Sequence, residues 1–297
     1  MRENPGYVGA ASAFDAVGAR ISAAPLDGEG MELREASLRG ARLIYVTPGH
    51  QFPLGITMSL ARRLQLLEWS LKSGALILED DYDSEYRYSG RPVPALQGLD
   101  RHGLVLFTGS FSKVLFPSLR LGYLVVPPDL VDVFSATISV TRRHAPLFEQ
   151  SVLCDFITEG HFGRHLRRMR QVYADRLTVL LECARQSLVG LLEISGVEAG
   201  LQTVGWLRAG LDAESAAVAA ARRDVDVTPL SRYRRGGSMP EGLQLGFAAV
   251  DTNEIRRGVR ELAIALEGEW GASYGGGTRS TPEVRAIRTP DRGPTRP

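Results

Sequence analysis

The lysines of this sequence are its first candidates for chemistry, because there are only two of them. Lys and Arg together number 35, yet Lys72 and Lys113 are the only lysines. A bias toward arginine replaces lysine wherever only charge matters, so a lysine that remains indicates a task that arginine cannot perform. Arginine stays protonated, whereas a lysine amine can act as a nucleophile. The composition selects two candidates and does not choose between them.

Lys113 lies in a polar run that directly follows an apolar, strand-like segment at 104–108. A lysine amine at this position can attack an aldehyde and form an imine. Ser110, Ser112 and the neighbouring backbone N–H groups can bind a phosphate at the start of a helix. Arg120 offers a planar, permanently charged donor to the same anion. This run therefore predicts a nucleophile beside an anion site.

Asp80 and Tyr82 follow another strand-like segment, at 75–78. A buried carboxylate beside a cationic heterocycle stays ionised and keeps the ring nitrogen protonated. Tyr82 can donate its O–H to a ring phenolate oxygen. An imine-forming lysine, a carboxylate, a phenol and a phosphate site are the parts that pyridoxal phosphate (PLP) chemistry requires. Each residue alone also fits a structural role, so their order after consecutive strands carries the prediction.

The elements that must position these residues alternate along the chain. An amphipathic helix is predicted at 59–73, with Lys72 on its polar side, and apolar runs predict buried strands at 41–47, 75–78, 104–108 and 121–126. Continuously apolar strands that alternate with helices indicate an α/β fold with a mostly parallel sheet covered on both faces. In such sheets ligands bind beyond the carboxyl ends of the strands, where Asp80 and Lys113 lie.

The pattern divides the chain into a PLP-binding large domain at 1–185, a small α+β domain at 186–269 and a disordered tail at 270–297. The large domain ends in helices, including a basic one at 161–185 that we interpret as solvated or facing a second subunit, with an anion site as the alternative. The small domain combines helices at 213–223 and 253–267, the second capped by Asp251 or Thr252, with strands at 191–197, 203–207, 225–228 and 243–248. The tail is rich in Gly, Ser, Thr, Pro and Arg.

Composition narrows the partners and the compartment. A net charge of +1 gives no support for a nucleic-acid or membrane partner, and no apolar run is long enough to cross a bilayer. The N-terminus has no apolar segment typical of a signal peptide. Two cysteines do not suggest a disulfide framework, so we expect a cytoplasmic protein. No pattern predicts a metal site.

Three segments, 46–55, 78–88 and 109–122, resemble the aminotransferase-like domain of MocR/GabR-type regulators of the GntR family. These are fold-type I PLP proteins related to class I/II aminotransferases, and the resemblance extends from about residue 3 to about residue 266. It implies PLP as cofactor and Lys113 as the Schiff-base lysine. It implies contacts of Asp80 with the pyridinium nitrogen and of Tyr82 with the 3′ oxygen. It also implies a stacked Tyr7, a loop with His50 and Gln51 beside the cofactor, and a phosphate site of Ser110, Ser112 and Arg120.

Three departures from the family pattern matter. Family members carry a winged helix-turn-helix domain before this region, and this chain does not, so we expect no DNA binding by this chain alone. The chain also begins after a phosphate-binding loop, a helix and a sheet strand that relatives supply, so we expect weaker PLP binding and an exposed sheet edge or hydrophobic face. Gln244 stands where many class I aminotransferases have the arginine that binds the substrate α-carboxylate. A neutral amide cannot supply that charged, bidentate contact.

Three hypotheses follow. The first is a transaminase in which Lys113 moves the proton and the amino group passes between an amino acid and a 2-oxo acid. The second is a PLP-sensing effector module of a transcriptional regulator, with little or no turnover. The third is a fragment that neither folds well nor binds PLP. Because fold-type I relatives build their sites at a dimer interface, the resemblance also implies a homodimer.

Overall fold

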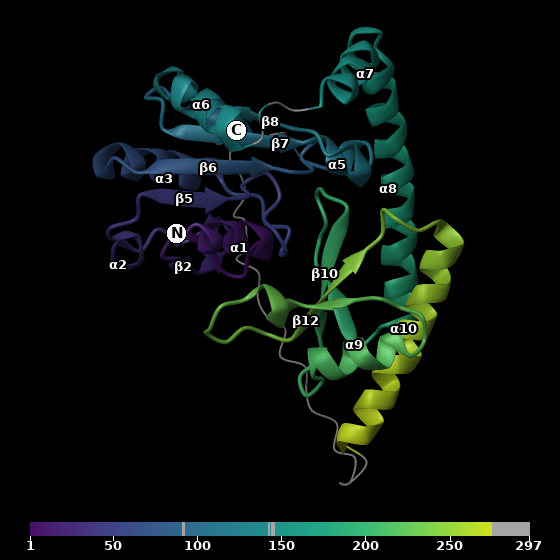
Figure 1. Ribbon diagram of the computed structural model, residues 1–297. Helices are drawn as coiled ribbons and strands as arrows, with labels where there is room; N and C mark the ends of the chain where they lie inside the picture. The colour runs from purple at the N-terminus through teal and green to yellow at the C-terminus, as the bar shows by residue number, and fades with distance from the viewer. Residues whose placement is uncertain (91–92, 142, 144–145, 275–297) are drawn as a thin grey trace, which may run out of the picture.

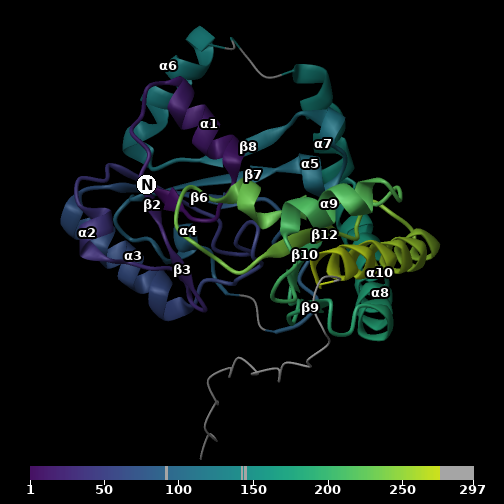
Figure 2. The same cartoon turned by 90° about the horizontal axis from the view of Figure 1, so that it is seen from below.

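The computed structural model describes residues 1–90, 93–141, 143 and 146–274. These residues form two lobes, each built on its own sheet, with the larger sheet in the upper part of Figure 1 and the smaller one below it. The long helix α8 (His161–Ser187) runs along one side of both lobes, and α10 (Thr252–Tyr274) packs beside it. Figure 2 shows the same pair of helices from below.

The larger sheet has six strands in the order β2-β1-β5-β6-β7-β8. Their bounds are β1 (Arg2–Glu3), β2 (Ala23–Ala24), β5 (Leu43–Val46), β6 (Leu76–Asp81), β7 (Val105–Ser110) and β8 (Gly122–Val125). All neighbours pair in parallel except β7 and β8, which confirms the predicted mostly parallel sheet. The link from β7 to β8 is too short for the crossover that a parallel pair requires, so the chain turns back on itself.

Strand β8 forms one edge of the larger sheet. This strand is the last of the sheet, and all four of its residues are exposed. An unpaired edge with exposed apolar side chains is a surface that proteins usually cover or pair.

Helix α3 (Leu60–Ser73) shows how the sequence builds the buried core of the larger lobe. The Ser59 hydroxyl caps its start by accepting from Arg62 N at 3.1 Å, and Gly74 ends it in a left-handed conformation with φ of 71°. Its Leu66 is fully buried in a cluster with sheet residues such as Ile77. On its outer side Lys72 pairs with Glu68 at 2.6 Å, so this lysine faces solvent as predicted.

The remaining elements of the larger lobe are short or peripheral. They are α1 (Val8–Ala16), the hairpin β3 (Leu26–Asp27) and β4 (Gly30–Met31), α2 (Glu35–Leu38), α4 (Leu96–Leu99), α5 (Phe111–Val114), the 3₁₀ turns η1 (Pro117–Leu119) and η2 (Pro128–Leu130), α6 (Val131–Thr141) and α7 (Leu147–Thr158).

The smaller lobe is a four-stranded antiparallel sheet in the order β11-β12-β10-β9, packed against helices. Its elements are β9 (Leu192–Ile194), β10 (Gln202–Leu207), α9 (Ala213–Ala221), β11 (Thr228–Pro229), η3 (Leu230–Tyr233), β12 (Gly242–Gly246) and α10. Leu177, Leu180 and Ala184 of α8 lie in its core, so α8 belongs to both lobes.

Two predicted boundaries in this lobe were wrong. The strand predicted at 225–228 begins only at Thr228, because Val225 N donates to Ala220 O at 3.1 Å and closes the end of α9 instead. The last helix continues to Tyr274, so residues 270–274 are helical rather than part of a tail. Residues 275–297 of the predicted tail lie outside the described residues. At the start of this helix Asp251 is the capping side chain, accepting from Asn253 N and Glu254 N.

Candidate cofactor site

Asp80 lies near the carboxyl end of β6, beside Thr108 of β7. Its carboxylate accepts a hydrogen bond from the hydroxyl of Tyr45, a buried residue of β5. Burial raises the pKa of Asp80, and the nearby charges of Asp81 and Asp83 act in the same direction, while the bond from Tyr45 opposes them. Burial and the Asp80 charge raise the pKa of Tyr45, so its hydroxyl stays protonated and donates. Tyr45 was not among the residues predicted from the sequence.

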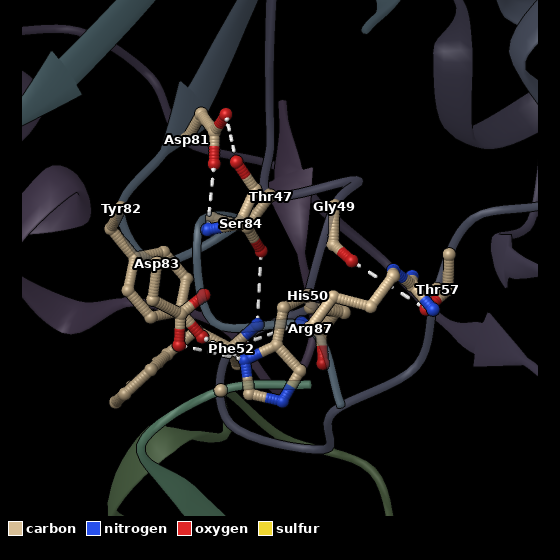
Figure 3. A network of polar contacts seen from close by, with 12 residues as sticks. Thr47, Gly49, His50, Phe52, Thr57, Asp81, Tyr82, Asp83, Ser84 and Arg87 are labelled. Atoms are coloured by element: carbon tan, nitrogen blue, oxygen red, sulfur yellow. Dashed lines mark hydrogen bonds and ion pairs between the residues drawn. The ribbon is translucent and has the colours of Figure 1, made fainter. Parts of the chain in front are cut away.

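Tyr82 joins a buried polar group formed with His50 and Asp83. The Nδ1 atom of His50 lies 3.0 Å from the Tyr82 hydroxyl oxygen and 3.0 Å from Oδ2 of Asp83. Figure 3 shows the three side chains turned toward one another below the end of β6. Burial raises the pKa of Tyr82, and the negative charges of Asp83 and Asp80 raise it further. Tyr82 is therefore held as a neutral phenol.

Gln51, the neighbour of His50, makes its hydrogen bonds with other groups of the protein. Its Nε2 donates to Pro5 O at 3.0 Å and to Phe52 O at 2.6 Å, and it lies 3.3 Å from Glu3 Oε2. Its Oε1 accepts from Leu54 N at 3.1 Å. The family resemblance implies that both residues lie in one loop beside the cofactor. In the structure His50 faces Tyr82, and Gln51 joins the loop to the N-terminal segment.

Glu3 is the buried acid of this network, accepting from the hydroxyl of Thr47 at 2.8 Å. Burial raises the pKa of Glu3 to about 7 from its usual 4.5; bonds from Thr47 and Gln51 lower it, and Asp80 raises it. The folded chain therefore binds this proton more tightly than the unfolded chain does, and Glu3 stabilises the fold fully only below pH 4.5.

We expect this contribution to be lost as the pH rises from 4.5 to about 7. At 1.36 kcal/mol for each pKa unit, the free energy of unfolding falls by roughly 3 kcal/mol over that window. Urea denaturation at several pH values measures it, with Glu3→Gln as the comparison, because the amide mimics the protonated acid and does not titrate. If the free energy of unfolding changes with pH in the same way for both proteins, Glu3 is not the source of the change.

Ser110 is the last residue of β7, and Ser112 and Lys113 lie on α5, which starts directly after it. The Ser110 hydroxyl caps this helix by accepting from Ser112 N at 3.1 Å. The carbonyl of Val114 anchors it against α8 by accepting from His165 Nε2 at 2.8 Å. Lys113 is exposed, and its amine has no hydrogen-bond or ion-pair partner within the part of the chain that the structure describes.

Arg120 lies in the loop that returns from α5 to β8. It is exposed and adopts a left-handed conformation with φ of 54°. A hydrogen bond from Phe111 N to Leu121 O, 3.1 Å long, closes the loop at its base. The structure thus brings four of the predicted residues to one end of β7, namely Ser110, Ser112, Lys113 and Arg120. Asp80 lies on the neighbouring strand β6, which pairs with β7 at this end through Asp81 and Gly109.

An aromatic cluster of Tyr7, Phe52, Tyr82 and Tyr233 lies beside this edge of the sheet. The Phe52 ring is at its centre, with centroids 5.6 Å from Tyr7, 6.0 Å from Tyr82 and 5.0 Å from Tyr233. All three contacts are edge-to-face, the geometry that aromatic pairs favour. Tyr7 is 47% exposed, so one ring of the cluster is open to solvent.

Tyr233 connects the smaller lobe to the site. Its hydroxyl donates to Gln244 Oε1 of β12 at 2.5 Å, and its carbonyl accepts from Gly6 N at 3.1 Å. Sequence reasoning missed Phe52 and Tyr233. Phe52 is next to Gln51 and could have been found from that loop, whereas no local signal relates Tyr233 to residues so far away in the chain.

The described residues contain neither a cluster of metal-binding side chains nor a membrane-spanning helix. No group of three or more His, Cys, Asp or Glu side chains there could hold a metal ion. In the same residues, no helix has both the length and the apolar character needed to cross a membrane.

Comparisons with known proteins place the chain in a family. No protein-family model matches it. It is 43% identical over 264 residues to the probable rhizopine catabolism regulatory protein MocR of Rhizobium meliloti, covering 89% of this chain and 54% of that protein. It is 30% identical to 2-aminoadipate transaminase of Thermus thermophilus, covering 90% of this chain and 69% of the enzyme.

A solved structure gives the same result. The α-aminoadipate aminotransferase LysN of Thermus thermophilus, crystallised with N-(5′-phosphopyridoxyl)-L-leucine, superposes with a TM-score of 0.84 at 29% identity, covering 91% of this chain and 71% of that one. The chain spans between 54% and 57% of the length of MocR and four other similar regulators. It therefore belongs to the fold-type I aminotransferase family, in which it matches the aminotransferase-type domain of MocR-type regulators.

Proposed function

We propose that this domain binds PLP through Lys113 and transfers an amino group between an amino acid and a 2-oxo acid. The observation that carries the proposal is the Lys113 amine, which lies at the carboxyl end of the sheet next to the strand of Asp80 and is unpaired among the described residues. The phosphopyridoxyl amino acid bound to LysN supports the choice of cofactor.

The residues present fit PLP in their chemistry. Asp80 is a partly buried carboxylate for a pyridinium nitrogen, and Tyr82 is a phenol that retains its proton for the 3′ oxygen. The exposed face of Tyr7 can stack on the ring. A phosphate would be held by the group at the end of β7, which comprises Ser110, Ser112 and Arg120.

PLP, when bound, supplies an electron sink for charge that develops at the α-carbon of the amino acid. Lys113 would hold the cofactor and then carry the proton that leaves the α-carbon. Asp80 would keep the ring nitrogen charged, and Tyr45 would hold the Asp80 carboxylate in place through its hydrogen bond. Gln51 would hold the loop, because its amide is already bonded to the protein, and His50 would act through Tyr82.

Gln244 favours a second candidate function, a PLP-sensing effector module with little or no turnover. Its Oε1 is occupied by Tyr233, and its neutral amide cannot hold an α-carboxylate as a guanidinium does. The regulator MocR is also more similar to this chain in sequence than the aminoadipate transaminase is. The sensor function uses the same PLP site as the transaminase function and differs from it only in turnover.

A coupled half-reaction assay separates the two functions. Protein loaded with PLP is mixed with a panel of L-amino acids, and pyridoxamine phosphate is quantified by chromatography, before and after addition of a 2-oxo acid. The transaminase predicts formation of pyridoxamine phosphate and its return to PLP, dependent on Lys113. A visible PLP band that no amino acid alters would favour the sensor. If no visible PLP band appears, both the transaminase and the sensor function are excluded.

Assembly and compartment are part of the same proposal. We propose a homodimer, with sedimentation at micromolar concentration as the measurement. A cytoplasmic location fits the two cysteines, Cys154 and Cys183, which are both free.

A further inference from the structure

The group formed by His50, Tyr82 and Asp83 contains one nitrogen that faces two oxygens. The His50 Nδ1 atom is 3.0 Å from Asp83 Oδ2 and 3.0 Å from the Tyr82 hydroxyl oxygen. The His50 and Asp83 side chains are only 3% and 1% exposed. Water therefore cannot compensate for a mismatched donor and acceptor, so the position of each proton is decided by these three groups.

The Asp83 carboxylate determines whether the Nδ1 atom of His50 carries a proton. An ionised Asp83 can only accept, and a lone pair on Nδ1 at 3.0 Å would face it with like charge density. Nδ1 therefore carries a hydrogen directed at Asp83, and the Tyr82 oxygen, at the same distance, accepts a share of it. Tyr82 then cannot donate to Nδ1, and its own proton is left to point away from His50.

Two glycines hold the imidazole in this orientation. A Cβ at Gly200 would lie 2.0 Å from the His50 Cε1 atom, and one at Gly55 would lie 3.1 Å from Nε2. Both glycines have positive φ, which other residues rarely adopt. The ring is therefore packed against backbone that comes from its own loop and from the start of the smaller lobe.

We propose that His50 is a positioning residue, which, held by Asp83, directs the Tyr82 proton toward an anionic oxygen on the cofactor side of the phenol. The ligand group is a phenolate, which for the function proposed above is the 3′ oxygen of PLP. The inference rests on that function only for the identity of the oxygen. Without the His50 N–H, the Asp83 carboxylate would compete for the Tyr82 proton.

The first test needs no cofactor. Nitrogen-15 NMR of the whole chain, with the His50 signal assigned by its loss in His50→Asn, reports whether Nδ1 is protonated. The proposal expects a protonated Nδ1 in the PLP-free protein. An unprotonated Nδ1 would overturn it, whatever PLP does.

The second test uses the PLP-loaded protein and the pH midpoint of its visible band. A hydrogen bond donated to an anion stabilises the deprotonated form, so losing it raises the midpoint. We expect His50→Phe to raise it by about one pH unit, toward the value of Tyr82→Phe. His50→Asn, whose amide can place an N–H where Nδ1 was, should restore it.

Ser84→Ala is the matched control, because Ser84 bonds Asp81 at 2.6 Å in the same loop and does not contact His50. It should leave the midpoint unchanged. The other acids and phenols whose charges act on Tyr82 are Glu3, Tyr45 and Asp80, and they are the same in all variants. Equal midpoints for His50→Phe and His50→Asn would overturn the positioning role. A missing band in the wild type would instead contradict the proposed function.

Discussion

Lys113→Ala abolishes the visible absorbance band that PLP forms with this protein, and borohydride reduction then attaches no cofactor to the chain. The physical reason is that alanine has no amine, and no other lysine lies at the carboxyl end of the sheet. The measurements are an absorbance titration with PLP and peptide mapping by mass spectrometry after reduction. In the wild type the label should lie on the peptide that contains Lys113.

Lys72→Ala is the natural control for this prediction. Lys72 is the only other lysine, and it lies on the exposed side of α3, paired with Glu68. An exposed pair of this kind contributes little to stability, so the variant should fold and bind PLP as the wild type does. Labelling of Lys72 or of the N-terminal amine in place of Lys113 would contradict the assignment.

Asp80→Ala weakens PLP binding by roughly ten- to hundredfold. Hydrogen bonds to charged groups contribute about 1.5–3 kcal/mol, and this variant removes the carboxylate that we propose holds the pyridinium nitrogen and that accepts from Tyr45. The Tyr45 hydroxyl is then left buried without its acceptor, which adds a cost to the folded chain. The dissociation constant of PLP, from absorbance or fluorescence titration, is the measurement.

Asp81→Ala provides the comparison at the adjacent position. Its carboxylate bonds Ser84 in the following loop rather than Tyr45, so we expect PLP affinity within about threefold of wild type, a change under about 1 kcal/mol. Thermal unfolding of both variants controls for loss of fold. If Asp81→Ala lost as much affinity as Asp80→Ala, the two acids would act through the charge of the loop and not through one contact.

The exposed strand β8 bears on both experiments. All its residues are exposed at the edge of the sheet, directly after the loop that carries Arg120. An unpaired apolar edge promotes self-association, and sedimentation of each variant at the concentration of the titration measures it.

The sequence by itself determined the layout of the larger lobe. Apolar runs predicted the central strands to within a few residues, because strands buried on both faces must be continuously apolar. Strand ends then placed Asp80 and Lys113 at one edge, since parallel strands end together. The lysine itself was isolated by composition, because the chain retains only two.

The tertiary structure alone decided how the polar groups pair. Tyr45 and Asp80 meet because β5 and β6 are neighbours in the sheet, and the antiparallel turn of β8 follows from a short connection. Tyr233 reaches Phe52 only when the two lobes come together, whereas its bond to Gln244 forms within the smaller lobe. Likewise, the two distances at His50 Nδ1 depend on a side-chain orientation for which Gly55 of the same loop and Gly200 of the smaller lobe leave space. Residue type and strand order are local properties of the chain, whereas these pairings depend on contacts between segments far apart in it.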